Sequence, residues 1–236
     1  MKIVRLFILI VILFSTLPIK AQNTKFDSTP ISNDIKSFNN VQAKTIEWAE
    51  NIKKMNHLND DYEIYYRYVI NASDTLNYRV LRNCIKLFVG RKPIERELVD
   101  VPSSNDKVSV VASLGCVAQN DGIMKFGLYV TVIPVMVFDF KPNRIRITIT
   151  VDKYQYGISA IGLATHTDPG VWAWIYNVPP FKKSENKKTW SSAFINTNAG
   201  CINLANEFVT LLNNNYDAIA QKLDKKDKEE LNDNNW

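Results

Sequence analysis

The sequence predicts an α+β fold, with an antiparallel sheet of about five strands, two helices packed on one face of it, and an additional N-terminal helix. Three segments, at about 41–55, 75–89 and 201–221, carry apolar residues at helical spacing. Between the second and the third, apolar and polar residues alternate, which is typical of strands with one buried face. Two amphipathic helices on one side of such a sheet would bury the apolar side of every element.

The N-terminus has the order of a cleaved export signal. Lys2 and Arg5 give a positive start, residues 6–14 form an unbroken apolar run, and Ala21 precedes a plausible cleavage point before Gln22. The run is too short for a spanning helix, which needs about 20 apolar residues. We therefore predict a signal peptide over residues 1–21 and an exported protein, periplasmic or extracellular. The alternative is an uncleaved N-terminal helix.

Net charge gives no argument for a nucleic-acid partner. The 236 residues carry a formal charge of +5, and loss of the predicted signal removes Lys2, Arg5 and Lys20 and no acid, which leaves +2. Nucleic-acid binding would need basic residues gathered on one face. The mature chain of 215 residues (236 less 21) is long enough for one domain with appendages.

The residue pattern divides the mature chain into three parts. Residues 22–61 are predicted to be an N-terminal arm and helix, with an extended polar segment at 22–40 and a helix from Val41 to Met55. Residues 62–224 are predicted to be the α+β domain, with an irregular aromatic insertion at about 157–198, and residues 225–236 a charged tail.

The domain is expected to begin with a strand at 62–70, which is dense in aromatic and β-branched residues. A helix at 75–89 follows, with Asp74 placed to cap its start and Gly90 expected in the left-handed conformation that ends many helices. Residues 91–106 contain two prolines and a turn cluster, and are expected to be a connection.

The next part of the chain predicts a meander of about four strands. The strand-like runs are 107–118, 123–133, 135–141 and 144–151. Asp121-Gly122 is a strong hairpin signal between the first two runs, and Pro142-Asn143 permits a second hairpin between the last two. Pro134 cannot donate to a strand ladder, so it marks a bulge or a new strand. The last run puts Ile145, Ile147, Ile149 and Val151 on one face.

The final helix is predicted to bury a stripe of Leu204, Phe208, Leu211, Leu212 and Ile219. From Lys222 onward the residues are mostly charged, and this end is expected to fray.

This order of elements resembles an exported bacterial family of unknown function whose domain has a TATA-binding-protein-like fold. The matching stretch runs from about Tyr62 to Tyr156 and includes Leu76-Asn77-Tyr78 at the start of the helix and the strand, turn and strand of residues 137–146. The resemblance implies an α+β fold and a Gram-negative source. It implies no catalytic residues, and the name of the fold implies nothing about DNA binding, because function depends on sites and not on folds.

Three cysteines, Cys84, Cys116 and Cys201, permit at most one disulfide. Buried core thiols are the preferred interpretation, and one bridge is the alternative that an oxidising compartment leaves open. The two histidines, His57 and His166, have no second His or Cys at metal-binding spacing, so we expect no metal site and no cofactor.

One alternative makes the protein a thiol hydrolase. Cys201 follows Asn198-Ala199-Gly200 at the expected start of the last helix, where the helix dipole would favour a thiolate. His166 would act as the base and Asp168 would orient it. The opposing interpretation is that Cys201 packs the first helical turn and that residues 166–169 are a polar loop.

The preferred interpretation is a non-enzymatic binding or assembly protein of a bacterial envelope. Arg144, Arg146, Thr148, Thr150, Tyr154 and Tyr156 are expected on one strand face, suited to a polar ligand or a partner protein. The same face could be an ordinary solvated surface. A third possibility is that the aromatic residues from Trp172 to Phe181 dock on an assembly or peripherally on a membrane. The sequence leaves the ligand, the partner and the oligomeric state open.

Overall fold

The computed structural model describes residues 23–41, 64–99, 106–121, 127–151, 154–160, 163–167 and 187–233. The predicted signal peptide, the predicted helix of residues 41–55 beyond Val41, His57, Asp168 and the aromatic residues from Trp172 to Phe181 lie outside these ranges. In chain order the elements are α2 (Thr29–Val41), β1 (Ile64–Asn71), α4 (Tyr78–Gly90), β2 (Arg96–Val99), β3 (Lys107–Ala112), β4 (Gly115–Asp121), β5 (Gly127–Val132), β6 (Val135–Lys141), β7 (Arg144–Val151), β8 (Tyr154–Ala160), β9 (Leu163–Thr167) and α6 (Lys187–Asp233).

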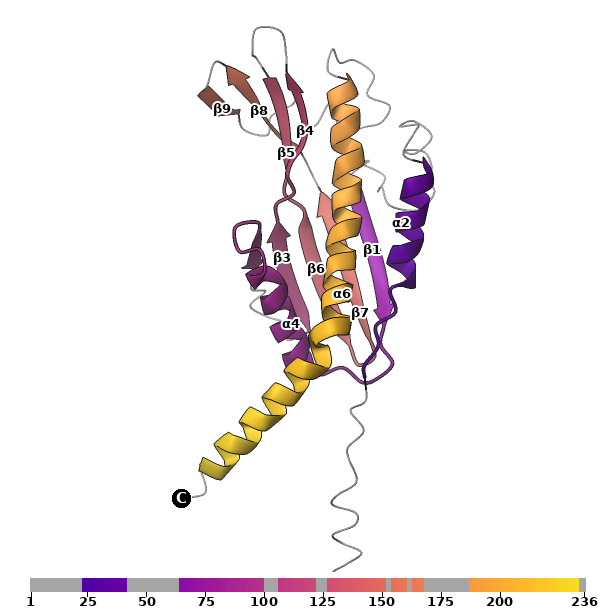
Figure 1. Ribbon diagram of the computed structural model, residues 1–236, viewed down its shortest axis with the longest axis vertical. Helices are drawn as coiled ribbons and strands as arrows, with labels where there is room; N and C mark the ends of the chain where they lie inside the picture. Colours follow the sequence, from indigo (N-terminus) through magenta and orange to yellow (C-terminus); the bar gives the residue numbers. More distant parts are fainter. Residues whose placement is uncertain are drawn as a thin grey trace, which may run out of the picture.

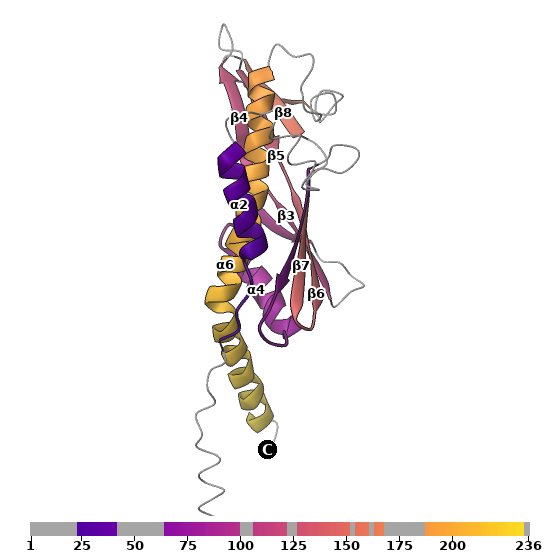
Figure 2. The same ribbon diagram turned by 90° about the vertical axis from the view of Figure 1, so that its right-hand side faces the viewer.

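The predicted fold class is confirmed. Five antiparallel strands form one sheet in the order β1-β7-β6-β3-β2, and the described helices α2, α4 and α6 lie on the same side of it (Figure 1 and Figure 2). The inward residues of β7, Ile145, Ile147, Ile149 and Val151, are all buried, as their alternation predicts. They pack in the same core as the buried stripes of α4 and α6.

A second sheet of four strands, which the sequence did not predict, stands above the first in Figure 1. Its order is β4-β5-β8-β9. The predicted strand of residues 107–118 is broken at Ser113 and Leu114, where Gly115 adopts a φ of +65°. The chain that returns beside it is interrupted at Ile133 and Pro134, between β5 and β6, as the missing N–H of proline indicates. The two halves of each strand therefore enter different sheets, although Ala112 N–H still donates to Pro134 C=O and Leu114 N–H to Val132 C=O, both at 2.9 Å.

Helix α4 confirms the predicted helix but has different ends. The Asn77 side chain caps its N-terminus, because its Oδ1 accepts from the backbone N–H groups of Arg79 at 2.9 Å and Val80 at 3.4 Å. Asp74, the predicted cap, instead accepts from the Ser73 hydroxyl. Gly90 belongs to the helix, and the C-cap Arg91 has a right-handed φ of −70°, so the left-handed glycine expected there is wrong.

Helix α2 corrects the prediction that residues 22–40 are extended. Ile31, Ile35 and Phe38 follow helical spacing, and Ile31 and Phe38 are buried. The many Asn and Ser residues between them hide this short apolar stripe in the sequence. Contacts of the helix with α6 and β1 supply the stabilisation that its intrinsic propensity lacks.

Three further segments are more regular than predicted. The predicted connection at 91–106 contains strand β2. The predicted irregular insertion, from residue 157 onward, contains the last residues of β8 and all of β9. Helix α6 begins at Lys187 and continues to Asp233, so the residues expected to fray are helical. In the described part of the chain, no helix combines the length and the apolar character needed to cross a membrane.

Candidate functional site

The outer face of the five-stranded sheet is the surface on which the predicted arginines lie. No described helix covers it (Figure 2). Cross-strand pairing places the outward side chains in rows: Tyr65, Thr150, Val135, Val111 and Glu97 form the first row, Arg67, Thr148, Val137, Ser109 and Val99 the second, Val69, Arg146, Asp139 and Lys107 the third, and Asn71, Arg144 and Lys141 the fourth. We call these residues the open face.

The open face is basic. It carries five cations, Arg67, Lys107, Lys141, Arg144 and Arg146, against two acids, Glu97 and Asp139. Asp139 is already neutralised, since its carboxylate accepts from Arg146 Nε at 2.8 Å and lies 3.4 Å from Lys107 Nζ. Arg144 lies opposite Lys141 and is exposed, so both charges face solvent.

The predicted binding set is divided between the two sheets. Arg144 and Arg146 lie on β7, whereas Tyr154 and Tyr156 lie on β8, next to β5 in the second sheet. The prediction placed all four on one strand, which is wrong because the chain leaves β7 at Val151 and starts a new strand at Tyr154. The structure therefore supports the arginines, and not the tyrosines, as parts of the open face.

The environment of Cys201 contradicts the proposed thiol nucleophile. Cys201 is not at the start of a helix, because α6 begins fourteen residues earlier at Lys187. Its side chain is fully buried, and this burial raises the pKa of the thiol well above its ordinary value. Neither a helix dipole nor solvent access favours a thiolate at this position. His166 lies on β9, and Asp168 falls outside the described residues, so the described part does not assemble the predicted triad.

The three cysteines are free thiols in the structure. Cys84 is buried on α4, and desolvation raises its pKa to about 12, as expected of a core thiol. Cys116 is exposed, contrary to the prediction that it packs in the core, because the break at Gly115 moves its strand into the second sheet. Among the described residues, no group of three or more His, Cys, Asp or Glu side chains is placed to hold a metal ion.

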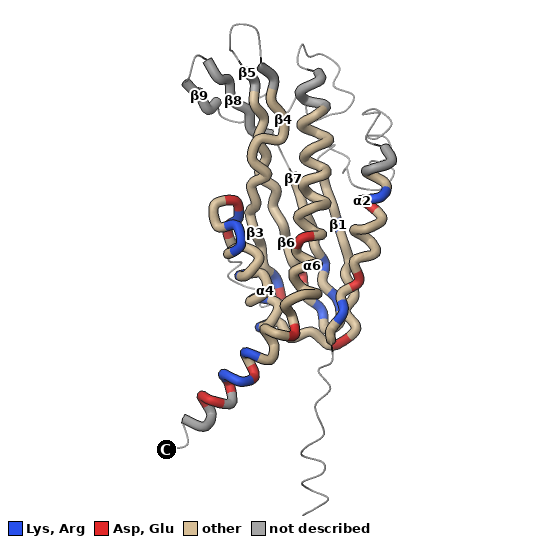
Figure 3. The backbone as a smooth tube through the Cα atoms, viewed as in Figure 1, with Lys and Arg blue, Asp and Glu red and all other residues tan. Residues whose placement is uncertain are grey.

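A second candidate site lies on the helical side of the molecule, between α4 and the C-terminal third of α6. A hollow of about 630 Å³ is lined by Tyr78, Arg79, Arg82, Asn83, Lys86, Leu223 and Lys226. We call it the basic groove. Figure 3 shows that charged residues gather in this half of the molecule, on α4 and along the end of α6, whereas β4, β5 and the upper half of α6 carry few.

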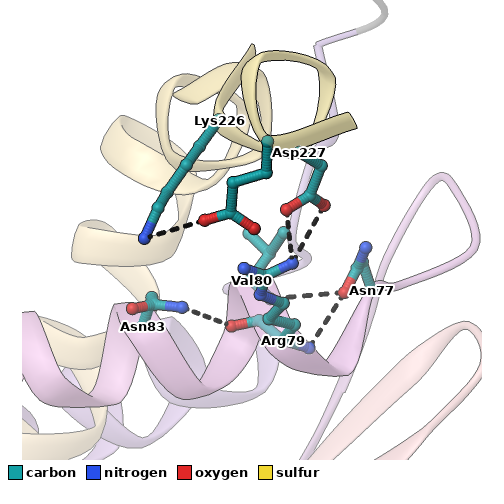
Figure 4. A network of polar contacts seen from close by, with 7 residues as sticks. Asn77, Arg79, Val80, Asn83, Lys226 and Asp227 are labelled. Carbon is teal, nitrogen blue, oxygen red and sulfur yellow. Dashed lines mark hydrogen bonds and ion pairs between the residues drawn. The ribbon is translucent and has the colours of Figure 1, made fainter. Parts of the chain in front are cut away.

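Two ion pairs lie at the basic groove, one between α4 and α6 and one within α6. Arg79 Nη1 donates to both carboxylate oxygens of Asp227, at 2.8 and 2.9 Å, and this contact joins α4 to α6 (Figure 4). Lys226 Nζ lies 3.5 Å from Glu230. The Asn83 amide donates to the Arg79 carbonyl at 2.8 Å, which fixes the orientation of the amide.

A smaller polar pocket, of about 310 Å³, lies beside the buried Arg96. The Arg96 guanidinium donates to Glu207 Oε2 at 2.6 Å and to Phe88 C=O at 3.0 Å, and its central carbon lies 3.9 Å from the centroid of the Phe88 ring. Its Nε is buried with no hydrogen-bond partner in the described part. The Arg96 charge lowers the pKa of the Glu207 carboxyl, chiefly through their hydrogen bond.

Comparisons with known proteins give two structural likenesses. A TBP-like protein from Parabacteroides distasonis is 12% identical with a TM-score of 0.44, and the match covers 67% of this chain and 97% of that one. A DUF4468 family protein from Bacteroides ovatus is 7% identical with a TM-score of 0.38, over 66% of this chain and 94% of that one. No family model and no curated protein matches the sequence. At these TM-scores the family membership suggested by residues 62–156 stays a prediction.

The sequence analysis missed the basic groove and the Arg96 pair. The signal for the groove was present in part, because Arg79, Arg82 and Lys86 share the polar side of a predicted helix. Their approach to α6 could not be seen, since the last turns of α6 were expected to fray.

Proposed function

We propose that the chain is an exported, non-enzymatic binding protein of a bacterial envelope, and that it holds an acidic protein partner on the open face. The observation that carries this proposal is a five-stranded sheet with one face uncovered by any described element and five cations against two acids upon it. Charge complementarity of this kind steers and orients a partner of opposite charge.

The chemistry of the open face favours a protein over a simple anion. Val69 is 40% exposed and Val99 41%, and the outward valines of the intervening strands are Val111 and Val135 in the first row and Val137 in the second. Apolar side chains beside arginines are typical of protein interfaces, where an apolar centre is bordered by polar groups. Tyr65 adds an aromatic ring that lies 5.6 Å from the Arg67 guanidinium carbon.

The N-terminal segment supports export with cleavage near residue 21. Thr24 N–H donates to Asp217 at 3.1 Å, and Phe26 N–H donates to Asn213 Oδ1 at 2.9 Å. The Phe26 ring is buried against Tyr216, at a centroid distance of 5.3 Å. All these contacts involve residues after the predicted cleavage point, so removal of residues 1–21 would leave them intact.

The export proposal predicts the N-terminus of the natural product. We expect N-terminal sequencing of the protein from the periplasmic or culture fraction of its host to begin at Gln22 or within two residues of it. A product that begins at Met1 and is recovered from the cytosol would contradict both the signal peptide and the envelope location.

The docking proposal predicts the effect of reversing the charges of Arg144 and Lys141, which are exposed and lie opposite each other on β7 and β6. The probe is a fluorescent 14-residue peptide of alternating Glu and Val, measured by anisotropy at low salt. We expect Arg144→Glu combined with Lys141→Glu to weaken binding about tenfold, since exposed charge pairs each contribute up to about 1 kcal/mol.

The matched control is Lys25→Glu combined with Lys36→Glu, which makes the same change of net charge at exposed positions outside the open face. We expect this control variant to bind the acidic peptide within about twofold of the natural protein. A peptide of alternating Lys and Val, tested on the natural protein, should not bind at all. Equal binding by the open-face variant and this control would refute docking on the open face.

A further inference from the structure

We propose that the basic groove is a second, separate binding site, which takes a phosphate-bearing ligand, either a small soluble polyphosphate or phosphate ester or the headgroup of a lipid. The groove lies on the helical side of the sheet and shares no residue with the open face. Nothing in the proposal about the acidic protein partner depends on it.

The size of the groove fits a small molecule. Its volume of about 630 Å³ lies within the range of about 300 to 1,000 Å³ that is usual for small-molecule sites. Its walls come from two helices, with five residues from α4 and two from α6. A ligand seated there would contact both helices at once.

Charge selects the class of ligand. Four of the seven lining residues are cations, Arg79, Arg82, Lys86 and Lys226, and no lining residue is an acid. Outside this lining, Asp227 pairs with Arg79 and Glu230 pairs with Lys226. Positions 79, 82 and 86 are three and four residues apart, so their side chains project from one side of α4 toward the same space.

Guanidinium geometry favours phosphate. Arginine presents five N–H donors in a planar fork that matches the oxygens of a phosphate group. The bond to Asp227 uses only Nη1 of Arg79 and holds that fork in a fixed place, so other donors of the same group stay available to a ligand. Lys86 and Lys226 add point charges for a second phosphate.

The groove also offers an apolar and an amide contact. The partly buried side chains of Tyr78 and Leu223 line it beside the cations, and Tyr78 is supported from below by Phe140, at a centroid distance of 6.0 Å. The Asn83 nitrogen is committed to the Arg79 carbonyl, which leaves the amide oxygen as an acceptor. These groups suit the organic part of a phosphate ester.

The test measures binding of sodium tripolyphosphate to the full mature chain by calorimetry at low salt, with the melting temperature as a second readout. We expect one saturable site and a rise in Tm of several degrees at saturation, because the ligand binds only the folded chain. Arg82→Gln combined with Lys86→Gln should weaken binding at least tenfold. Lys25→Gln combined with Lys36→Gln, the matched control outside the groove, should leave it within twofold.

A second variant, Lys86→Gln combined with Lys226→Gln, separates loss of binding from misfolding. Both side chains are exposed, so their replacement should not disturb the fold. It should also weaken binding while the circular dichroism spectrum stays that of the natural protein. Vesicles of phosphatidylglycerol and phosphatidylcholine form a separate arm: sedimentation that depends on Arg82 and Lys86, without binding of tripolyphosphate, would assign the phosphate to a lipid headgroup. Absence of both kinds of binding, or equal binding by the groove variants and the control, would overturn the proposal.

Discussion

Replacing Phe208 by alanine is expected to lower the free energy of unfolding by about 3 to 5 kcal/mol. The Phe208 ring is fully buried, with its centroid 4.5 Å from that of Phe138 and 5.4 Å from that of Phe88. It joins α6 to β6 and α4, so its loss leaves a cavity where three elements meet. Urea unfolding followed by circular dichroism would measure the change.

The control for this prediction is Leu87→Ala, on the outer side of α4, where the side chain is 36% exposed. We expect it to change the unfolding free energy by no more than about 0.5 kcal/mol. A loss of less than about 1 kcal/mol in Phe208→Ala would mean that the three rings do not form the centre of the core.

Replacing Glu207 by alanine is the second substitution with a large expected effect, a loss of about 2 to 3 kcal/mol. Removing one partner of a buried ion pair usually costs about 3 to 5 kcal/mol, and the cost should be lower here because the Glu207 side chain is 36% exposed. The Arg96 side chain is 1% exposed, so its charge would remain buried, with the Phe88 carbonyl and ring as its partners among the described residues. Urea unfolding at pH 7 would measure the loss.

The same pair predicts a dependence of stability on pH. Arg96 lowers the pKa of Glu207 in the folded chain, so the folded state favours the ionised carboxyl. This contribution is present above the unfolded pKa of about 4.3 and is lost as the pH falls through the lower folded value. The advantage of the natural protein over Glu207→Gln should therefore shrink below about pH 4. Glu97→Gln, at an exposed position of β2, should show no such change.

The spacing of apolar residues along the chain was sufficient to predict an element where one of its faces is apolar and the other polar. Residues 144–151 alternate strictly and form β7, and the stripe of Leu81, Cys84, Ile85 and Phe88 forms the buried side of α4. The same spacing failed to predict an element where the apolar stripe is short. Helix α2 has only Ile31, Ile35 and Phe38 among polar residues, and its packing on α6 and β1 decides its conformation.

Some residues of the candidate sites could be predicted from the sequence and others could not. Arg144 and Arg146 were predicted to face outward, since outward positions follow from the period of two. The separation of Tyr154 and Tyr156 from them was not predictable, because a continuous alternating run does not show where a chain changes sheets. Cys201 was misplaced for a related reason: the start of α6 at Lys187 lies in a polar segment that gives no helical signal.

By itself the sequence determined the class of the fold, the antiparallel meander and the faces of β7, since the alternation of apolar and polar residues is a local property of the chain. Only the tertiary structure decided that β3–β4 and β5–β6 divide between two sheets, that Arg96 is buried against Glu207, and that α6 meets α4 at the basic groove. The last two features join residues more than a hundred positions apart, in the pairs Arg96 with Glu207 and Arg79 with Asp227. Contacts of that kind arise from the packing of whole elements, which no local spacing encodes.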